Sequence, residues 1–196
     1  MIGNISIGDK IPEIRAKAYF PKKDTIEEIK IPNGKWTILA FYPGDFTFVC
    51  ATDIEALTKA YNDFSKNGAE IYAVSTDSIY SHKAWTMSSP RAMESAIPLV
   101  EDFNKEISKL FGVLNESTGA SRRSVVILDP EGNVEYLSVF NDNLGKDVEH
   151  IYKAFMGLKF IKEAVTKKGH MCAIPANWHI GEKPLDIDVV KDIGKL

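Results

Sequence analysis

The chain has 196 residues, of which 44% are hydrophobic and 26% are charged, and its formal net charge is −3. This composition is typical of a globular protein with one buried core, and it excludes a general electrostatic attraction to nucleic acid or anionic lipid. No apolar run is long enough to span a bilayer, and residues 1–14 lack the basic and apolar regions of a secretory signal, so we expect a cytoplasmic protein.

The first predicted elements are two strands of a hairpin, at residues 14–20 and 26–31. Residues 21–24, with the sequence PKKD, are typical turn formers and connect the two strands. Residues 36–42 follow as a near-continuous apolar run. Such a run is typical of a central strand that is covered on both faces of a sheet.

A helix and a further strand are predicted next. Apolar residues recur at helical spacing after the central strand, namely Ile54, Leu57, Tyr61 and Phe64. Asn67-Gly68 is a typical helix end, and residues 70–75 resume as a strand. Two strands joined by a helix favour parallel pairing with a right-handed crossover.

The second half of the chain continues this alternation. It contains a predicted helix at 77–89, a strand at 97–100, a helix at 104–111, strands at 124–128 and 134–140, and a long helix from residue 148 to residue 168. Helical periodicity is lost from Gly169 onward. The sequence therefore predicts an α/β domain at residues 1–168 and a carboxy-terminal arm at residues 169–196, and the periodicity alone allows more than one arrangement of the strands.

Cys50 lies at the junction between the central strand and the following helix. The first turn of a helix presents unpaired N–H groups and the positive end of the helix dipole, which favour a thiolate over a thiol. Thr47, three residues earlier, is a suitable N-cap residue. Cys50 also shares the apolar face of the helix with Ile54, so the alternative is a small hydrophobic residue that only fills the core.

Pro43, Thr47 and Cys50 have the spacing Pro-x-x-x-Thr-x-x-Cys. Together with the surrounding stretch FYPGDFTFVCATD, this motif resembles the signature of the typical two-cysteine peroxiredoxins, in particular the bacterial alkyl hydroperoxide reductase C subunits. The resemblance extends over nearly the whole chain. Two neighbours depart from the family pattern, because Ala51 stands where Pro is common and Asp53 where Glu is common.

The resemblance implies a thioredoxin-like fold, in which a central mixed sheet is flanked by helices. It also implies a thiol-dependent peroxidase that reduces hydrogen peroxide and organic hydroperoxides. Cys50 would attack the O–O bond and become a sulfenic acid. Thr47 would hydrogen-bond within the pocket, and Pro43 would shield the thiolate from bulk water. Arg123, at the start of the strand at 124–128, is similar in register to the family's catalytic arginine, although an arginine at a strand end is more commonly a solvated surface residue.

A second cysteine, Cys172, lies on the predicted arm. Its surroundings resemble the resolving-cysteine region of the family, but Ala173 and Ile174 separate it from the Pro-Ala pair that follows. The resemblance implies that Cys172 attacks the Cys50 sulfenic acid of the partner subunit, and that an external dithiol or a flavoprotein reductase restores both thiols. It also implies a homodimer, with a ring of five dimers as a larger assembly. The alternative is a tail cysteine that only packs.

Two other functions fit parts of the sequence. A thiol–disulfide oxidoreductase would share the expected fold, but it normally uses Cys-x-x-Cys, and residue 53 is Asp. A redox-switched oligomeric chaperone or interaction protein would use the same cysteines and the same assembly. The spacing of cysteines and histidines matches no zinc site, and we expect neither a metal nor a cofactor.

The sequence also suggests roles for His82 and Lys146. His82 and Trp85 match a His-x-x-Trp stretch of the family, and we expect His82 to be packed or hydrogen-bonded rather than to act as a base, because a preformed thiolate needs none. Lys146 stands where relatives often have Arg. We therefore expect a weaker contact there, near the dimer interface or the arm.

Overall fold

The computed structural model describes residues 5–168 and 172–186. The chain divides after Lys146 into two compact units. The first unit contains the main sheet, and the second contains a long helix followed by a short β-ribbon.

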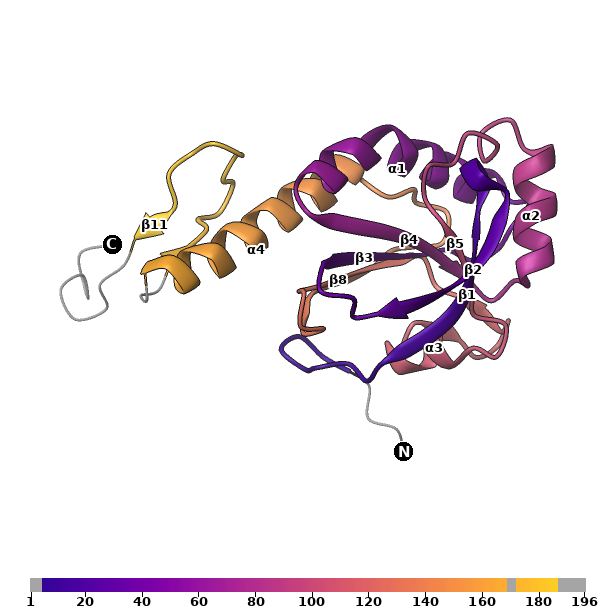
Figure 1. Ribbon diagram of the computed structural model, residues 1–196, viewed down its shortest axis with the longest axis horizontal. Helices are drawn as coiled ribbons and strands as arrows, with labels where there is room; N and C mark the ends of the chain where they lie inside the picture. Colours follow the sequence, from indigo (N-terminus) through magenta and orange to yellow (C-terminus); the bar gives the residue numbers. More distant parts are fainter. Residues whose placement is uncertain (1–4, 169–171, 187–196) are drawn as a thin grey trace. The chain divides into compact units, whose positions relative to one another are not determined.

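The first unit is built on a mixed sheet (Figure 1). Its seven strands are β1 (Ile14–Phe20), β2 (Thr25–Ile31), β3 (Trp36–Phe41), β4 (Ala69–Ser75), β5 (Leu99–Glu101), β8 (Ser124–Leu128) and β9 (Val134–Val139). Their order is β2-β1-β5-β4-β3-β8-β9. β4 is parallel to both β3 and β5, and the other neighbouring pairs are antiparallel. The sheet is therefore mixed, as the family resemblance implies.

Helices cover both faces of the sheet. The first unit contains α1 (Phe48–Lys66), α2 (Ile79–Ser88), α3 (Glu106–Leu110) and a 3-10 turn, η1 (Pro21–Lys23). Figure 1 shows α1 on one face of the sheet and α3 on the other. All residues of β3 are buried, and the ring of Phe41 packs edge-on against Phe111, which follows α3, with 5.8 Å between the ring centroids. The apolar run is thus covered on both sides, as predicted.

The strand–helix–strand unit β3-α1-β4 places the start of α1 at the carboxyl end of the central strand. Residues 36–41 pair in parallel with residues 69–74, as predicted. Gly68 ends the helix connection with a φ of 82°, a conformation that glycine adopts without steric cost. Residues 42–47 form the loop from β3 to α1. This loop and the first turn of α1 lie at the edge of a sheet where α/β proteins commonly bind ligands.

Short elements differ most from the prediction. β6 (Leu114–Asn115) and β7 (Ala120–Ser121) form a small hairpin, and strands of two residues carry no periodic pattern that would reveal them. The helix expected at residues 104–111 is shorter. The carboxylate of Asp102 fixes the amino-terminal turn of α3 by accepting the N–H groups of Ile107 and Ser108 at 2.9 and 2.8 Å.

The second unit contains α4 (Val148–Lys168) and a ribbon of β10 (Cys172–Ala173) and β11 (Leu185–Asp186). Within this unit, Ile174 and Trp178 approach α4 at Gly157, where an added Cβ would lie 3.6 Å from the Ile174 side chain. The described part of the predicted arm is therefore folded against the long helix. Residues 169–171 and 187–196 of that arm lie outside the described residues.

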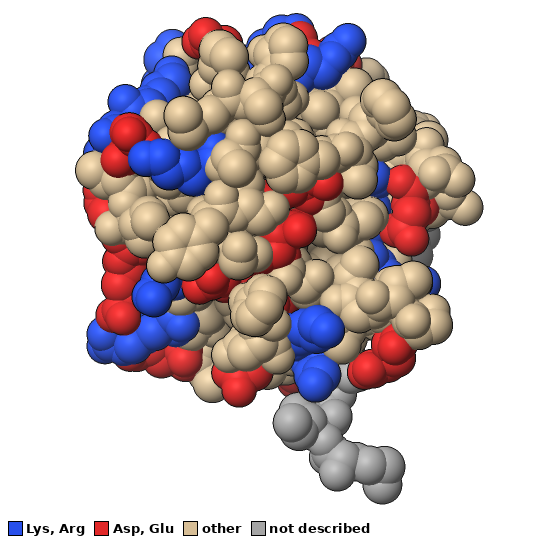
Figure 2. All heavy atoms as spheres, turned by 90° about the vertical axis from the view of Figure 1, so that its right-hand side faces the viewer, with Lys and Arg blue, Asp and Glu red and all other residues tan. Residues whose placement is uncertain are grey.

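Surface charges are mixed in sign. On the face drawn in Figure 2, Lys and Arg side chains lie among Asp and Glu side chains, and acidic groups gather near the centre. This face has no continuous basic surface of the kind that binds nucleic acid. Among the described residues, no helix is both long enough and apolar enough to cross a membrane.

Candidate active site

Cys50 lies in the first turn of α1. Thr47 is the N-cap residue, with extended backbone angles, and Cys50 is the third residue of the helix. The whole of Cys50 is buried, with no exposed surface. The first turn of a helix carries unpaired N–H groups and the positive end of the helix dipole, and both stabilise a negative charge. The position therefore suits a thiolate.

Arg123 immediately precedes β8 and is 1% exposed. Its Nη2 donates a hydrogen bond to the Cys50 sulfur at 3.4 Å. Nε and Nη2 also donate to the carbonyl oxygen of Asp142, at 3.1 and 2.9 Å, and Nη1 donates to the carboxylate of Asp53. The guanidinium is therefore fixed from several sides, with one edge against the sulfur. A cation in that place favours a thiolate and can stabilise charge on a peroxide oxygen.

Two further buried charges complete this cluster. Asp53 lies one helical turn after Cys50 and accepts from Lys146 on both carboxylate oxygens. The Lys146 backbone N–H donates to Oδ1 and its Nζ donates to Oδ2, each at 2.8 Å. The side chains of Arg123, Asp53 and Lys146 are only 1–3% exposed. From the sequence, Asp53 and Lys146 are noted only because they depart from a family pattern. The one local pattern that could have placed Asp53 near the sulfur is its helical spacing from Cys50.

The two cations differ in how they titrate. Burial lowers the pKa of Lys146 below the ordinary value of 10.5, and the Asp53 carboxylate opposes this shift without reversing it. Burial also lowers the pKa of Arg123, but the negative charges of Asp53 and Cys50 more than offset the effect, so this pKa lies above its ordinary value. Arg123 therefore supplies a permanent positive charge, and Lys146 supplies one that can be lost.

Thr47 and Pro43 lie in the loop at residues 42–47. The Thr47 hydroxyl donates to the carbonyl oxygen of Gly44 at 2.9 Å, and the side chain makes no capping hydrogen bond to α1. Thr47 is thus the N-cap residue by position only, because its hydroxyl is engaged within the loop. Thr47 is exposed and Pro43 is partly buried. Both residues belong to the segment that leads into the turn of Cys50.

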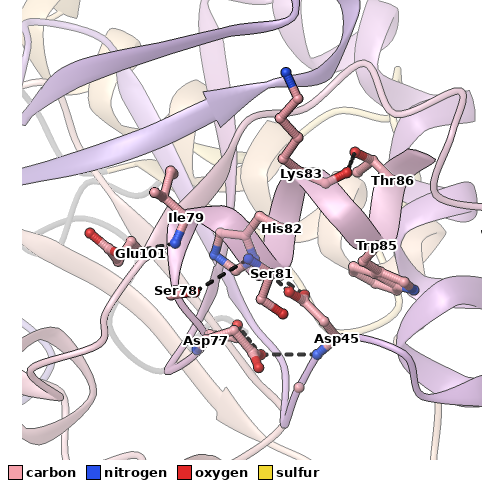
Figure 3. Close-up of polar contacts among 12 residues, drawn as sticks. Asp45, Asp77, Ser78, Ile79, Ser81, His82, Lys83, Trp85, Thr86 and Glu101 are labelled. Carbon is pink, nitrogen blue, oxygen red and sulfur yellow. Dashed lines mark hydrogen bonds and ion pairs between the residues drawn. The ribbon is translucent and has the colours of Figure 1, made fainter. Parts of the chain in front are cut away.

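A buried Asp–His pair holds this loop (Figure 3). Asp45 Oδ2 lies 2.9 Å from His82 Nδ1, and the Tyr42 hydroxyl donates to Asp45 Oδ1 at 2.8 Å. The other ring nitrogen of His82 faces the carbonyl oxygen of Val100 at 3.2 Å. The backbone N–H of Asp45 donates to Asp77 Oδ2 at 2.9 Å. His82 is therefore a packed, hydrogen-bonded residue, as the sequence predicts, and its partners tie the loop to α2 and β5.

Asp45→Ala is expected to lower the free energy of unfolding by about 3 kcal/mol. The change leaves His82 and the Tyr42 hydroxyl buried without their carboxylate partner. Urea unfolding followed by circular dichroism measures the loss. Asp63→Ala removes an exposed carboxylate from α1 and should stay within about 0.5 kcal/mol of the wild type. A similarly small change for Asp45→Ala would show that the pair does not hold the loop.

An open groove of about 340 Å³ lies beside the start of α1, with Thr47 and Ala51 in its wall. Phe46 and Phe48 also line it, and these two residues are 62% and 94% exposed. We call Phe46 and Phe48 the apolar patch. Exposed apolar groups gathered in this way commonly mark a surface that contacts another protein.

Cys172 is placed in the second unit. It is 5% exposed and pairs with Asp186 in the β10–β11 ribbon. Cys50 and Cys172 are both free thiols, and they belong to different compact units of the chain.

Several known proteins are similar to this chain in both sequence and fold. Residues 7–137 match the model of the AhpC/TSA family. The alkyl hydroperoxide reductase C of Amphibacillus xylanus is 35% identical over 190 residues, which cover 95% of this chain and 98% of that protein. The reduced 2-Cys peroxiredoxin of Plasmodium vivax superposes with a TM-score of 0.78 at 33% identity, covering 91% of each chain. Enterococcus faecalis AhpC superposes with a TM-score of 0.76 at 29% identity, covering 85% of this chain and 97% of that chain.

These similarities confirm the predicted thioredoxin-like fold and the resemblance that the motif around Cys50 indicates. The family match covers more than half of the chain, and the match to the reductase runs over nearly all of it. The chain therefore belongs to the AhpC/TSA family and is a two-cysteine peroxiredoxin, a thiol-dependent peroxidase.

Proposed function

We propose that this peroxidase reduces hydrogen peroxide and small organic hydroperoxides through a sulfenic acid on Cys50, followed by a disulfide between Cys50 of one subunit and Cys172 of another. The observation that supports the proposal most directly is the buried hydrogen bond from Arg123 Nη2 to the Cys50 sulfur. A sulfur in the first turn of a helix and beside a permanent cation is arranged to react as a thiolate nucleophile.

In the first step, the Cys50 thiolate attacks one peroxide oxygen and the O–O bond breaks. The sulfur is oxidised to the sulfenic acid, and the departing oxygen takes up a proton and leaves as water or an alcohol. Arg123 stabilises the negative charge that develops on this oxygen. Thr47 hydrogen-bonds to the incoming peroxide, and Pro43 shields the sulfur from bulk water.

In the second step, the Cys172 thiolate of the partner subunit attacks the sulfur of the sulfenic acid and a disulfide forms. The departing hydroxide takes up a proton and leaves as water. An external dithiol, either a thioredoxin-type protein or a flavoprotein reductase, restores both thiols by exchange. In this scheme, residues 1–168 are the peroxidase domain and residues 169–196 are the arm that carries the resolving cysteine.

A homodimer is the smallest unit that can complete this cycle. The apolar patch supports a larger assembly, because Phe48, 94% exposed, would be removed from water by a second copy of the chain. We propose that this assembly is a ring of five dimers. A cytoplasmic location fits a disulfide that forms only transiently.

Cys172→Ser is expected to separate the two steps. The variant should form the Cys50 sulfenic acid as fast as the wild type, because Cys172 lies in another compact unit than the Cys50–Arg123 pair. It should form no disulfide-linked dimer. Rapid mixing with hydrogen peroxide, trapping of the sulfenic acid with dimedone and non-reducing electrophoresis measure both steps. A linked dimer that persists in the variant would contradict the role of Cys172, and a variant that forms no sulfenic acid would contradict the proposed function.

A further inference from the structure

Lys146 is a buried lysine that makes three hydrogen bonds next to the reactive cysteine. Its backbone N–H and its Nζ hold the two carboxylate oxygens of Asp53, each at 2.8 Å. Nζ also donates to the carbonyl oxygen of Phe41, the last residue of the central strand, at 2.8 Å. A buried ammonium group is costly unless it is paired in this way. Lys146 therefore fixes the Asp53 carboxylate relative to the end of β3.

Asp53 connects Lys146 to the residue that contacts the sulfur. Its Oδ2 accepts from both Lys146 Nζ and Arg123 Nη1. Arg123 in turn donates to Cys50 through Nη2. A displacement of the Asp53 carboxylate would thus free one end of the guanidinium, which would then be held only by the Asp142 carbonyl oxygen and the Cys50 sulfur.

The charges of this cluster balance only when Lys146 is protonated. A Cys50 thiolate and the Asp53 carboxylate carry two negative charges, and Arg123 and Lys146 carry two positive charges. Charges interact strongly at short range in a buried site, and an uncompensated charge there is unfavourable. Loss of the Lys146 charge would leave the cluster with one excess negative charge and would disfavour the thiolate.

We propose that Lys146 is a positioning residue for peroxide reduction, which holds Asp53 and thereby Arg123 against the Cys50 sulfur, and that its deprotonation slows the reaction at alkaline pH. The proposal rests on the function proposed above. The ionisable groups that face Lys146 are Asp53 and Cys50 of α1 and Arg123 before β8, and β3 offers only the uncharged carbonyl group of Phe41. Lys146 is the cation of this cluster that can lose its charge within an accessible pH range.

The direction of the pH effect follows from the buried environment. Burial lowers the pKa of Lys146 below 10.5, so the folded protein loses this proton at a lower pH than the unfolded chain does. Between these two pKa values the unfolded chain binds more protons, and the contribution of Lys146 to stability therefore rises with pH. In this pH window the rate of Cys50 oxidation should fall, whereas the titration of Lys146 does not lower the free energy of unfolding. This difference separates the proposed effect from alkaline unfolding.

The test compares single-turnover oxidation of Cys50 by hydrogen peroxide in three variants across neutral and alkaline pH. Lys146→Met should lower the rate at neutral pH by roughly 100-fold. Lys146→Arg should restore part of that rate, and its alkaline decline should move to higher pH because a guanidinium does not titrate there. Lys59→Met is the control, since it removes a lysine of α1 that is 73% exposed and pairs with Glu55 on the surface. It should behave as the wild type does.

The outcomes distinguish this inference from the proposed function. A wild-type protein that does not react quickly with peroxide would overturn the proposed function itself. A reactive wild type, with Lys146→Met equal to it in rate and pH profile, would overturn the role of Lys146 alone. If circular dichroism shows that Lys146→Met is unfolded, Lys146→Arg decides the question. If the rate of Lys146→Arg declines at the same alkaline pH as the wild-type rate, the proposal is overturned. If its rate declines only at higher pH, the proposal is supported.

Discussion

Cys50→Ser is expected to abolish the fast reaction with hydrogen peroxide. A serine hydroxyl is nearly the same size and can still accept the Arg123 hydrogen bond, so the buried cluster should remain folded. Its oxygen is not ionised near neutral pH, and a peroxide cannot oxidise it to an analogue of a sulfenic acid. The change therefore removes the chemistry and leaves the packing in place.

Stopped-flow mixing with peroxide, followed by intrinsic fluorescence, measures this loss. Cys172 remains in the variant, so any slow consumption of peroxide gives the reactivity of the second thiol. Circular dichroism of the variant controls for the fold. A fast phase that survives in Cys50→Ser would assign the reaction to another residue and would contradict the assignment of Cys50.

Arg123→Met is expected to slow the oxidation of Cys50 by about 10²–10³-fold, the range found when one donor to a developing oxyanion is removed. Methionine fills part of the same buried space but has neither charge nor N–H groups. The variant loses the bond to the sulfur and the ion pair with Asp53, which then has Lys146 as its remaining cation. Fold and cysteines are retained, so the loss should appear in the rate constant for the first step.

Arg122→Met is a matched control for this variant. Arg122 is the neighbouring residue, it is exposed, and its side chain lies outside the buried cluster around the sulfur. The rate constant of the control should stay near the wild-type value. If Arg123→Met were only a few-fold slower than the wild type, or if both variants were equally slow, the guanidinium of Arg123 would not be a catalytic group.

Much of the first unit can be predicted from the sequence, because its main elements have strong local patterns. The apolar run at residues 36–42 marks a strand covered on both faces, and the helical spacing after it identifies α1. These two elements meet at Cys50, so the junction itself can be read from the sequence. The short hairpin of β6 and β7 cannot, since its strands are stabilised by pairing rather than by periodicity.

The surroundings of Cys50 are less predictable, because they depend on distant contacts. Asp53 and Lys146 are 93 positions apart, and Asp45 and His82 are 37 positions apart. Charged residues in such positions usually read as solvated surface groups, and only the tertiary fold shows that these are buried and paired. Arg123 is identified as a candidate only through the family resemblance, for the same reason.

The sulfur of Cys50 has no exposed surface, so a thiol on a second protein chain cannot reach it in this conformation. A small oxidant needs only a transient gap to enter, whereas a covalent link between two chains needs the cysteine to come out. Phe48 is almost fully solvated in the same turn, so unwinding that turn gives up little packing from this side chain. In the cycle proposed above, Cys50 therefore has to alternate between an enclosed and an extruded position, and the ease of that movement would limit how quickly each oxidised molecule is recovered.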